Sequence, residues 1–269
     1  PEISMKIDSN LSGFWDTDTS VYTTGANEVP VEVTISDSNL NSKKISVKKD
    51  GSELTDDEIS KIITWDGNKA TINLKATENE THKYTITANA EDKAGNLNSL
   101  TKTVIIDKTA PTLTAAFKGT EKPGAAKDEK YYKDATLTIT ASDDKSFNWE
   151  NFKKAVSTAV SSFTAKDKDG NSVENAIIVN YDEDNKSSAK ITFVKDANYS
   201  LKEISYTDEC GNTKELDLAK IKNEFTIDNT LPTASSFSIS TFKNGDESET
   251  IKEWSPEKIL SESIIENPY

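Results

Sequence analysis

The sequence predicts an all-β protein built from tandem sandwich-like units. The main observation is a signature that occurs twice: Asp-Lys-Ala-Gly-Asn with Ile-Asp-Lys-Thr-Ala-Pro, and later Asp-Glu-Cys-Gly-Asn with Ile-Asp-Asn-Thr-Leu-Pro. Its residues are Asp92, Gly95, Asn96, Asp107 and Pro111 in the first copy, and Asp208, Gly211, Asn212, Asp228 and Pro232 in the second. The two prolines stand 121 positions apart, an ordinary domain length. Such a recurrence indicates a repeated domain.

The repeat divides the chain of 269 residues into two whole units and a remainder. Unit one is residues 1–110 and unit two is residues 111–231. Residues 232–269 are expected to be a partial third repeat or a C-terminal extension. The linker from Asp107 to Pro111 is short, and proline restricts its backbone. We therefore expect an extended rod in which the units meet through a small interface.

Alternating apolar and polar residues predict the strands of unit one. The alternation covers residues 1–8, 29–35, 70–74 and 84–90, and a period of two marks a strand with one buried face. Thr55 and Glu58 have the spacing of a capping box, which predicts a helix of one or two turns. About seven short strands in a unit of this length are typical of an immunoglobulin-like β-sandwich. This fold buries a tryptophan, and we expect Trp65 in that role.

Unit two follows the same plan with one departure. Apolar residues recur there at intervals of three and four, which predicts an amphipathic helix over about residues 147–163. They are Trp149, Phe152, Val156, Ala159, Val160 and Phe163. Two interpretations of this helical insertion stay open: it covers an edge or end of the sandwich, or it binds a partner.

Together these features resemble the bacterial Ig-like repeat domains of Gram-positive cell-surface and secreted proteins. The resemblance extends over most of unit one, whereas unit two departs from the pattern at Cys210, at Leu231 and in the helix. It implies tandem immunoglobulin-like β-sandwiches that serve as stalks, adhesion modules or spacers beside catalytic domains. It also implies an extracellular or cell-surface location. We expect a monomeric fragment of such a protein.

Charge and composition exclude several classes of partner. The net charge is −14 and no arginine is present, so the chain repels nucleic-acid backbones and anionic membrane surfaces. No apolar run reaches 18 residues, so we expect no membrane insertion. A single cysteine allows no disulfide within the chain, and we expect Cys210 to be a small buried residue.

The residue inventory also argues against catalysis. The chain has one histidine and no Gly-x-Ser-x-Gly motif, and it lacks the histidine and cysteine ligands of a zinc site. We therefore expect no enzyme activity and no cofactor, with calcium at Asp107 and Asp228 as one alternative to solvated turns. We expect Asp92 to lie at the same end of unit one as Asp107, and Asp208 at the same end of unit two as Asp228.

Exposed aromatic residues are the candidate binding residues. Phe14 and Trp15 stand in a polar stretch, and Trp149 begins the predicted helix. Tryptophan is enriched at binding hot spots, so these residues are candidates for contact with a host protein or glycan. Three hypotheses follow: modules for adhesion or ligand presentation, a specific host-protein or glycan binding fragment, and a passive spacer of a larger secreted carbohydrate-active enzyme.

Overall fold

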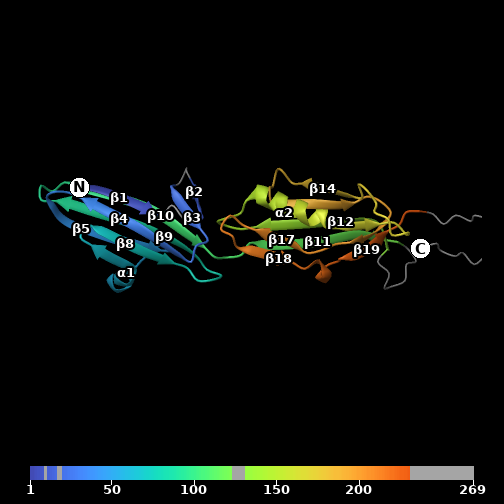
Figure 1. The fold of residues 1–269 in the computed structure, drawn as a ribbon, viewed down its shortest axis with the longest axis horizontal. Coiled ribbons are helices and arrows are strands. Elements are labelled where there is room, and N and C mark those ends of the chain that lie inside the picture. Colours follow the sequence, from blue (N-terminus) through green and yellow to red (C-terminus); the bar gives the residue numbers. More distant parts are fainter. Residues whose placement is uncertain (9–10, 17–19, 123–130, 231–269) are drawn as a thin grey trace, which may run out of the picture.

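The computed structural model describes residues 1–8, 11–16, 20–122 and 131–230. These residues contain two hydrophobic cores, one between Met5 and Ile106 and the other between Leu113 and Ile227. Figure 1 shows the corresponding β-rich bodies end to end, as an extended rod. Pro232 and the rest of residues 232–269, expected as a partial third repeat or a C-terminal extension, lie outside the described residues.

Unit one is a sandwich of two sheets with the strand orders β1-β4-β8-β7 and β2-β3-β10-β9-β5-β6. The first sheet contains β1 (Glu2–Ile7), β4 (Glu28–Ser36), β7 (Ile63–Asp66) and β8 (Lys69–Lys75). The second contains β2 (Phe14–Asp16), β3 (Val21–Thr24), β5 (Leu40–Lys49), β6 (Ser52–Glu53), β9 (Thr81–Asp92) and β10 (Leu97–Asp107). The alternation in β4 buries Val29, Val31, Val33 and Ile35, so this prediction is confirmed.

The short helix α1 (Asp56–Ile62) begins where the capping box predicts. Thr55 is its N-cap: the Thr55 side chain accepts a hydrogen bond from the Glu58 backbone N–H, and the Glu58 side chain accepts one from the Thr55 N–H. The two bonds satisfy donors that a helix start leaves free. No residue of α1 is buried, so the helix lies on the outer surface of the sandwich.

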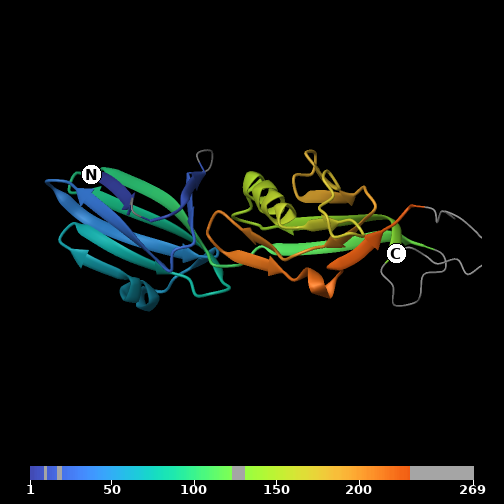
Figure 2. The same ribbon diagram turned by 45° about the vertical axis from the view of Figure 1, so that its right-hand side comes forward.

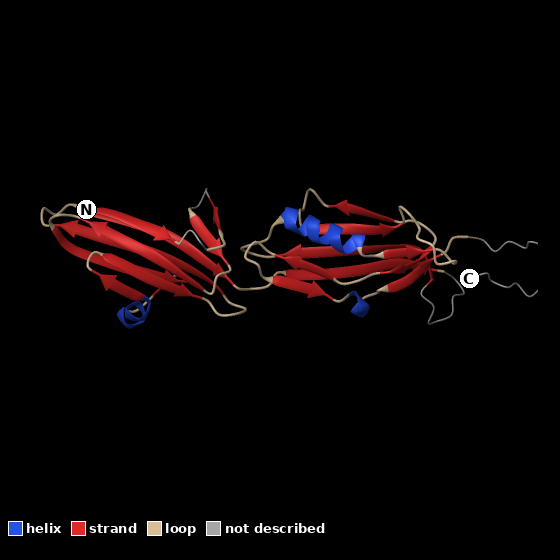
Figure 3. Cartoon of the chain, in the orientation of Figure 1, coloured by secondary structure: helices blue, strands red, loops and turns tan. Residues whose placement is uncertain are grey.

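Unit two has β12 as its central strand. β12 (Tyr131–Ser142) pairs with β11 (Thr112–Glu121), β15 (Ser188–Phe193) and β19 (Glu224–Ile227). The other elements are α2 (Trp149–Ser161), β13 (Thr164–Lys166), β14 (Ile177–Tyr181), β16 (Ala197–Ser200), β17 (Ile204–Thr207), β18 (Thr213–Leu216) and the 3-10 helix η1 (Leu218–Lys220). Figure 3 shows α2 lying along one side of the strands.

The predicted helix of unit two is confirmed, and it stands at the point of the chain order where unit one has β5. In both units a strand that ends at Ser-Asp, Ser36-Asp37 or Ser142-Asp143, leads into the element in question. In unit one that element is β5, which pairs with β9. In unit two it is α2, which packs beside β17. Figure 2 shows α2, in yellow-green, on the outer side of the strands of unit two. The helix buries Phe152, Val156 and Ala159, so its apolar face covers this side of the core.

Two expectations are wrong. Asp92 and Asp107 lie at opposite ends of unit one, because β9 and β10 form a long antiparallel hairpin in which Asp107 pairs with Thr81. Trp65 is 40% exposed rather than buried, because β7 is an edge strand and the indole lies under the Lys43 ammonium.

Candidate functional site

The second copy of the signature meets the end of the first copy at the contact between the two units, which we call the junction. Asp107 ends β10 of unit one and is fully buried. Its carboxylate accepts hydrogen bonds from Thr81 Oγ1 (2.6 Å) and from Ser146 Oγ (2.6 Å). The Asp107 carbonyl oxygen accepts a third bond from Asn212 Nδ2 (3.0 Å). One residue of unit one is therefore held by two loops of unit two.

The Asp-x-x-Gly-Asn part of the signature closes a hairpin. Asp208 accepts bonds from both the backbone N–H (2.8 Å) and the Nδ2 (3.0 Å) of Asn212. Gly211 has a φ of 87°, which only glycine adopts readily. Asp92 and Asn96 repeat these bonds at the distal end of unit one. The hairpin is thus a structural device, and in unit two it also presents Asn212 to Asp107.

A backbone contact brings the units very close together. A Cβ atom on Gly25 would lie 1.9 Å from the carbonyl oxygen of Cys210. Only a residue without a side chain fits at this position. Gly25 precedes β4 and Cys210 lies in the hairpin of unit two, so this contact also joins the two units. Neither Gly25 nor Ser146 stood out in the sequence, because nothing local marks a residue that touches the next domain.

Three carboxylates converge at the junction. The side chains of Asp107, Asp143 and Asp208 each offer an oxygen within 4.8 Å of the others. The pKa of Asp208 is raised, chiefly because the carboxyl group is buried, and the nearby Asp107 carboxylate adds to this rise. The hydrogen bonds from Asn212 lower the pKa, but their effect is smaller than the net rise. The Ser146 hydroxyl donates to Asp107 (2.6 Å) and the Ser146 backbone N–H donates to Asp143 (2.8 Å), so both carboxylates already accept bonds from protein donors.

The cluster offers three oxygen ligands in that arrangement, whereas calcium takes six to eight. The two acid pairs expected at the candidate calcium residues do not form, because Asp107 lies at the opposite end of unit one from Asp92. Asp228 lies at the far end of unit two from Asp208, with Lys122 Nζ at 3.8 Å and the Thr230 N–H at 3.0 Å.

Cys210 lies half-buried in the junction hairpin. Burial raises the pKa of its thiol to about 12, and the neighbouring Asp107 and Asp208 carboxylates add to this effect. A reactive cysteine needs a lowered pKa. Cys210 thus lies at the close contact with Gly25, and the raised pKa of its thiol disfavours the reactive thiolate form.

The candidate aromatic residues have different surroundings. Trp15 in β2 is 44% exposed, with its ring 5.2 Å from that of Tyr22 and the Lys102 ammonium 5.0 Å above it. Phe14 is half-buried beside it. Trp149 is also half-buried and packs between Phe152 and the loop that carries Glu183, which accepts a bond from its Nε1 (3.1 Å). Trp15 is thus the more accessible of the two tryptophans.

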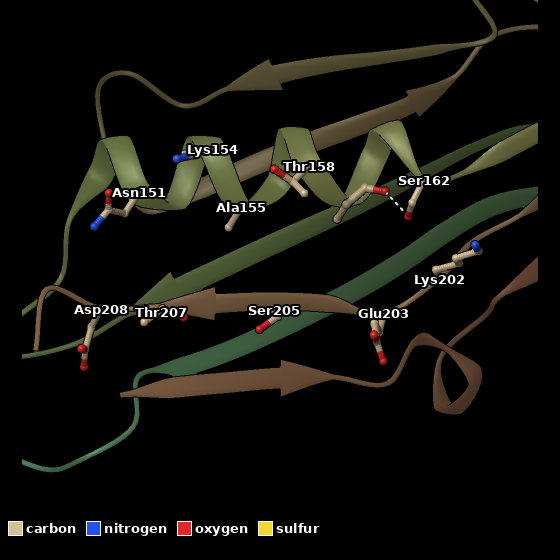
Figure 4. A pocket seen from close by; sticks show the side chains of 11 residues that line it. Asn151, Lys154, Ala155, Thr158, Ser162, Lys202, Glu203, Ser205, Thr207 and Asp208 are labelled. Carbon is tan, nitrogen blue, oxygen red and sulfur yellow. Dashed lines mark hydrogen bonds between the residues drawn. The ribbon is translucent and has the colours of Figure 1, made fainter. Parts of the chain in front are cut away.

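A groove runs between α2 and β17 in unit two. Its volume is about 620 Å³. Figure 4 shows the two walls: α2 and its C-cap contribute Asn151, Lys154, Ala155, Thr158 and Ser162, and the strand side contributes Lys202, Glu203, Ser205, Thr207 and Asp208. The sequence predicted the helix but not the groove, because a helical pattern does not show which strand edge the helix lies beside.

Comparisons with known proteins identify no family for this chain. No family model matches the sequence, and no curated protein matches it. Among solved structures, an I-band fragment of titin is 12% identical with a TM-score of 0.38; the match covers 83% of this chain and 64% of that one. Murine CEACAM1b is 15% identical with a TM-score of 0.33, over 84% and 99% of the two chains.

A third similar structure is Bacteroides ovatus SGBP-B, of a mixed-linkage glucan utilization locus, in complex with a mixed-linkage heptasaccharide. It is 14% identical with a TM-score of 0.23, over 84% of this chain and 47% of that one. These similarities concern the fold alone. The chain is an all-β protein of tandem Ig-like sandwiches, as its own strand orders show. No helix in the described ranges is long and apolar enough to cross a membrane.

Proposed function

We propose that this chain is a non-catalytic pair of Ig-like modules that presents a binding surface, for adhesion or ligand display, on a Gram-positive bacterial surface or secreted protein. The observation that carries this proposal is the junction. Asp107 is buried and bonded to Ser146 and Asn212 of the other unit, so the units keep one mutual orientation. A fixed alignment of two units places a binding surface at a distance from the point of attachment, which suits a protein that presents ligands. Catalysis does not require such an alignment.

The rod geometry is tested by NMR relaxation on the intact two-unit chain. Two units held by the junction tumble together, so amides of both report the same rotational correlation time. Separate correlation times for the two units would overturn a fixed rod. Display on the cell is tested by protease shaving of intact source bacteria, which should release peptides of both units from the surface. Their absence from the shaved fraction would contradict surface presentation.

A more specific function, binding of a host protein or glycan, is favoured by the exposed Trp15 and by the groove beside α2. Binding screens of the intact chain against glycoprotein and glycan panels test it. Binding that Trp15→Ala removes would support recognition through β2. A panel without any binder would favour the passive spacer of a larger secreted enzyme.

A further inference from the structure

The helix α2 leaves one edge of β17 without a neighbouring strand. In unit one the matching edge of β9 is covered along its length by β5. In unit two β17 pairs with β18 alone, within the residues that the structure describes. Strand pairing on this side resumes only where β13 pairs with β16. An unpaired strand edge carries free N–H and C=O groups that can accept a further strand.

The hairpin bonds show which backbone groups face the groove. The Asp208 N–H donates to the Asn212 carbonyl (3.0 Å), so these two residues form a hydrogen-bonded pair. Hydrogen-bonded and non-hydrogen-bonded pairs alternate along an antiparallel ladder, so Thr207 and Ser205 belong to non-hydrogen-bonded pairs. Their backbone N–H and C=O groups therefore point away from β18. The side chains of Ser205 and Thr207 are exposed and line the groove.

In unit one, the edge of β9 that corresponds to this edge of β17 pairs with a strand, β5. There the Lys93 N–H donates to the Asn39 carbonyl (2.8 Å), and the β5–β9 ladder follows directly. Unit two begins in the same way, with the Glu209 N–H donating to the Ser146 carbonyl (2.9 Å). The chain then turns into α2 at its N-cap Asn148, so the ladder stops after one bond.

The groove beside this edge has the size to hold a short peptide. Its volume of about 620 Å³ lies in the usual range for ligand sites, roughly 300–1,000 Å³. Lys154 and Lys202 balance Glu203 and Asp208 along its walls, so the lining has no strong preference of its own. The whole chain carries a charge of −14, which attracts a basic partner at long range.

We infer that the edge of β17 beside α2 is a docking site for an extended basic peptide segment of a partner protein, which adds a strand to the sheet. Main-chain bonds to Ser205 and Thr207 supply the affinity, and the small residues Ala155 and Thr158 leave room on the helix side. This inference deepens the proposed function, because it names the surface that the rod presents and the class of its partner.

The test uses the intact chain and a synthetic peptide with the sequence of β5, Leu40–Lys49, which is the strand that fills this edge in unit one. Hydrogen exchange is followed by NMR while the peptide is titrated. At saturation, the amides of Ser205 and Thr207 should exchange at least about tenfold more slowly, because each becomes hydrogen-bonded. Unchanged exchange at both amides, at peptide concentrations up to millimolar, would overturn the inference.

Controls separate strand addition from charge attraction. Two further peptides carry N-methyl groups on alternate residues, one set for each strand edge, with charge and side chains unchanged. One of them should lose binding and the other keep it, because a strand pairs through one edge. Equal binding of both would show attraction by charge alone and would refute the docking mode.

Matched protein variants locate the site. Thr158→Trp fills the groove from the exposed face of α2 and should weaken the peptide at least about tenfold, or 1.4 kcal/mol. Ser157→Trp, on the next exposed residue outside the groove, should leave binding within about twofold of the parent. Equal effects of the two would place the peptide elsewhere. A failed peptide test leaves the relaxation test of the rod unaffected, so the two proposals fail separately.

Discussion

Ser146 Oγ donates a hydrogen bond of 2.6 Å to Asp107 Oδ2, and this bond joins a loop of unit two to the last strand of unit one. The Asp107 side chain has no access to water, so its oxygens depend on protein donors. Polar contacts to this buried carboxylate are therefore part of what joins the two units.

Ser146→Ala should loosen the junction while both units stay folded. The substitution leaves a buried carboxylate oxygen without this donor, which costs about 1–3 kcal/mol. NMR relaxation should then give different correlation times for the two units. Ser38→Ala, in the matching loop at the far end of unit one, is the control and should leave a single correlation time. A single correlation time in Ser146→Ala would show that the bond does not hold the junction.

Gly25→Ala should also disturb the junction, for a steric reason. The added Cβ would meet the Cys210 carbonyl oxygen at 1.9 Å, so the units must move apart. We expect chemical-shift changes in residues of both units on either side of the junction. Gly51→Ala is the control: it strains a turn with φ of 86° but faces open space, so its shift changes should remain in unit one. Confinement of the Gly25→Ala changes to unit one would contradict the contact.

Much of the fold follows from local sequence patterns, because the period of a strand or helix is a local property. The alternation in Val29–Ile35 predicts β4, and the spacing from Trp149 to Phe163 predicts α2. The prediction that Trp65 is buried was wrong, because burial depends on whether its strand lies at an edge of the sheet. The strand order is a property of the whole sheet and is not visible in a local pattern.

The junction could not be derived in the same way. Asp107 and Ser146 are 39 positions apart and meet only because β10 carries the chain from Asp92 to the opposite end of the sandwich. The copies of the signature were visible in the sequence. Their head-to-tail contact, with Asn212 of one copy against Asp107 of the other, depends on how whole units dock.

Asp208 should make the stability of unit two depend on pH in a particular direction. Its native pKa is raised, chiefly by burial, above the ordinary aspartate value of 3.8. At pH values between the unfolded-state pKa and the native pKa of Asp208, the native state binds more protons than the unfolded state. The free energy of unfolding therefore falls as the pH rises through this range. The cost is then constant at higher pH.

Asp208→Asn removes this titration and provides the measurement. Urea unfolding of both proteins from pH 4 to pH 8 should show parent stability decreasing relative to the variant as pH rises, then levelling off. The lowered pKa values of Asp92 and Asp167 make the free energy of unfolding rise with pH. Both proteins contain these residues, so their contribution cancels in the difference between parent and variant. A difference that is constant with pH, or that grows in favour of the parent, would contradict a raised pKa.

Trp149 and Trp15 should differ in their effect on stability. Trp149 stacks on Phe152 at 5.6 Å between ring centroids and donates to Glu183, so Trp149→Ala should cost about 2 kcal/mol, less than a fully buried tryptophan. Trp15→Ala should cost about 1 kcal/mol, since its main contact is one ring pair with Tyr22. Urea unfolding measures both. An equal or larger loss for Trp15 would make it a structural residue rather than a candidate contact.

Cys210 should report the opening of the junction. Burial raises the pKa of its thiol to about 12, so at pH 8 nearly all of the thiol is protonated. Iodoacetamide should therefore label the native protein at least about a hundredfold more slowly than the urea-unfolded chain, because the thiolate is the nucleophile. Gly25→Ala should speed native labelling, since it separates the hairpin that carries Cys210 from unit one, and Gly51→Ala should not. Rapid labelling of the parent would show that the thiol is already open to solvent, and equal rates in the two glycine variants would show that unit one does not shield it.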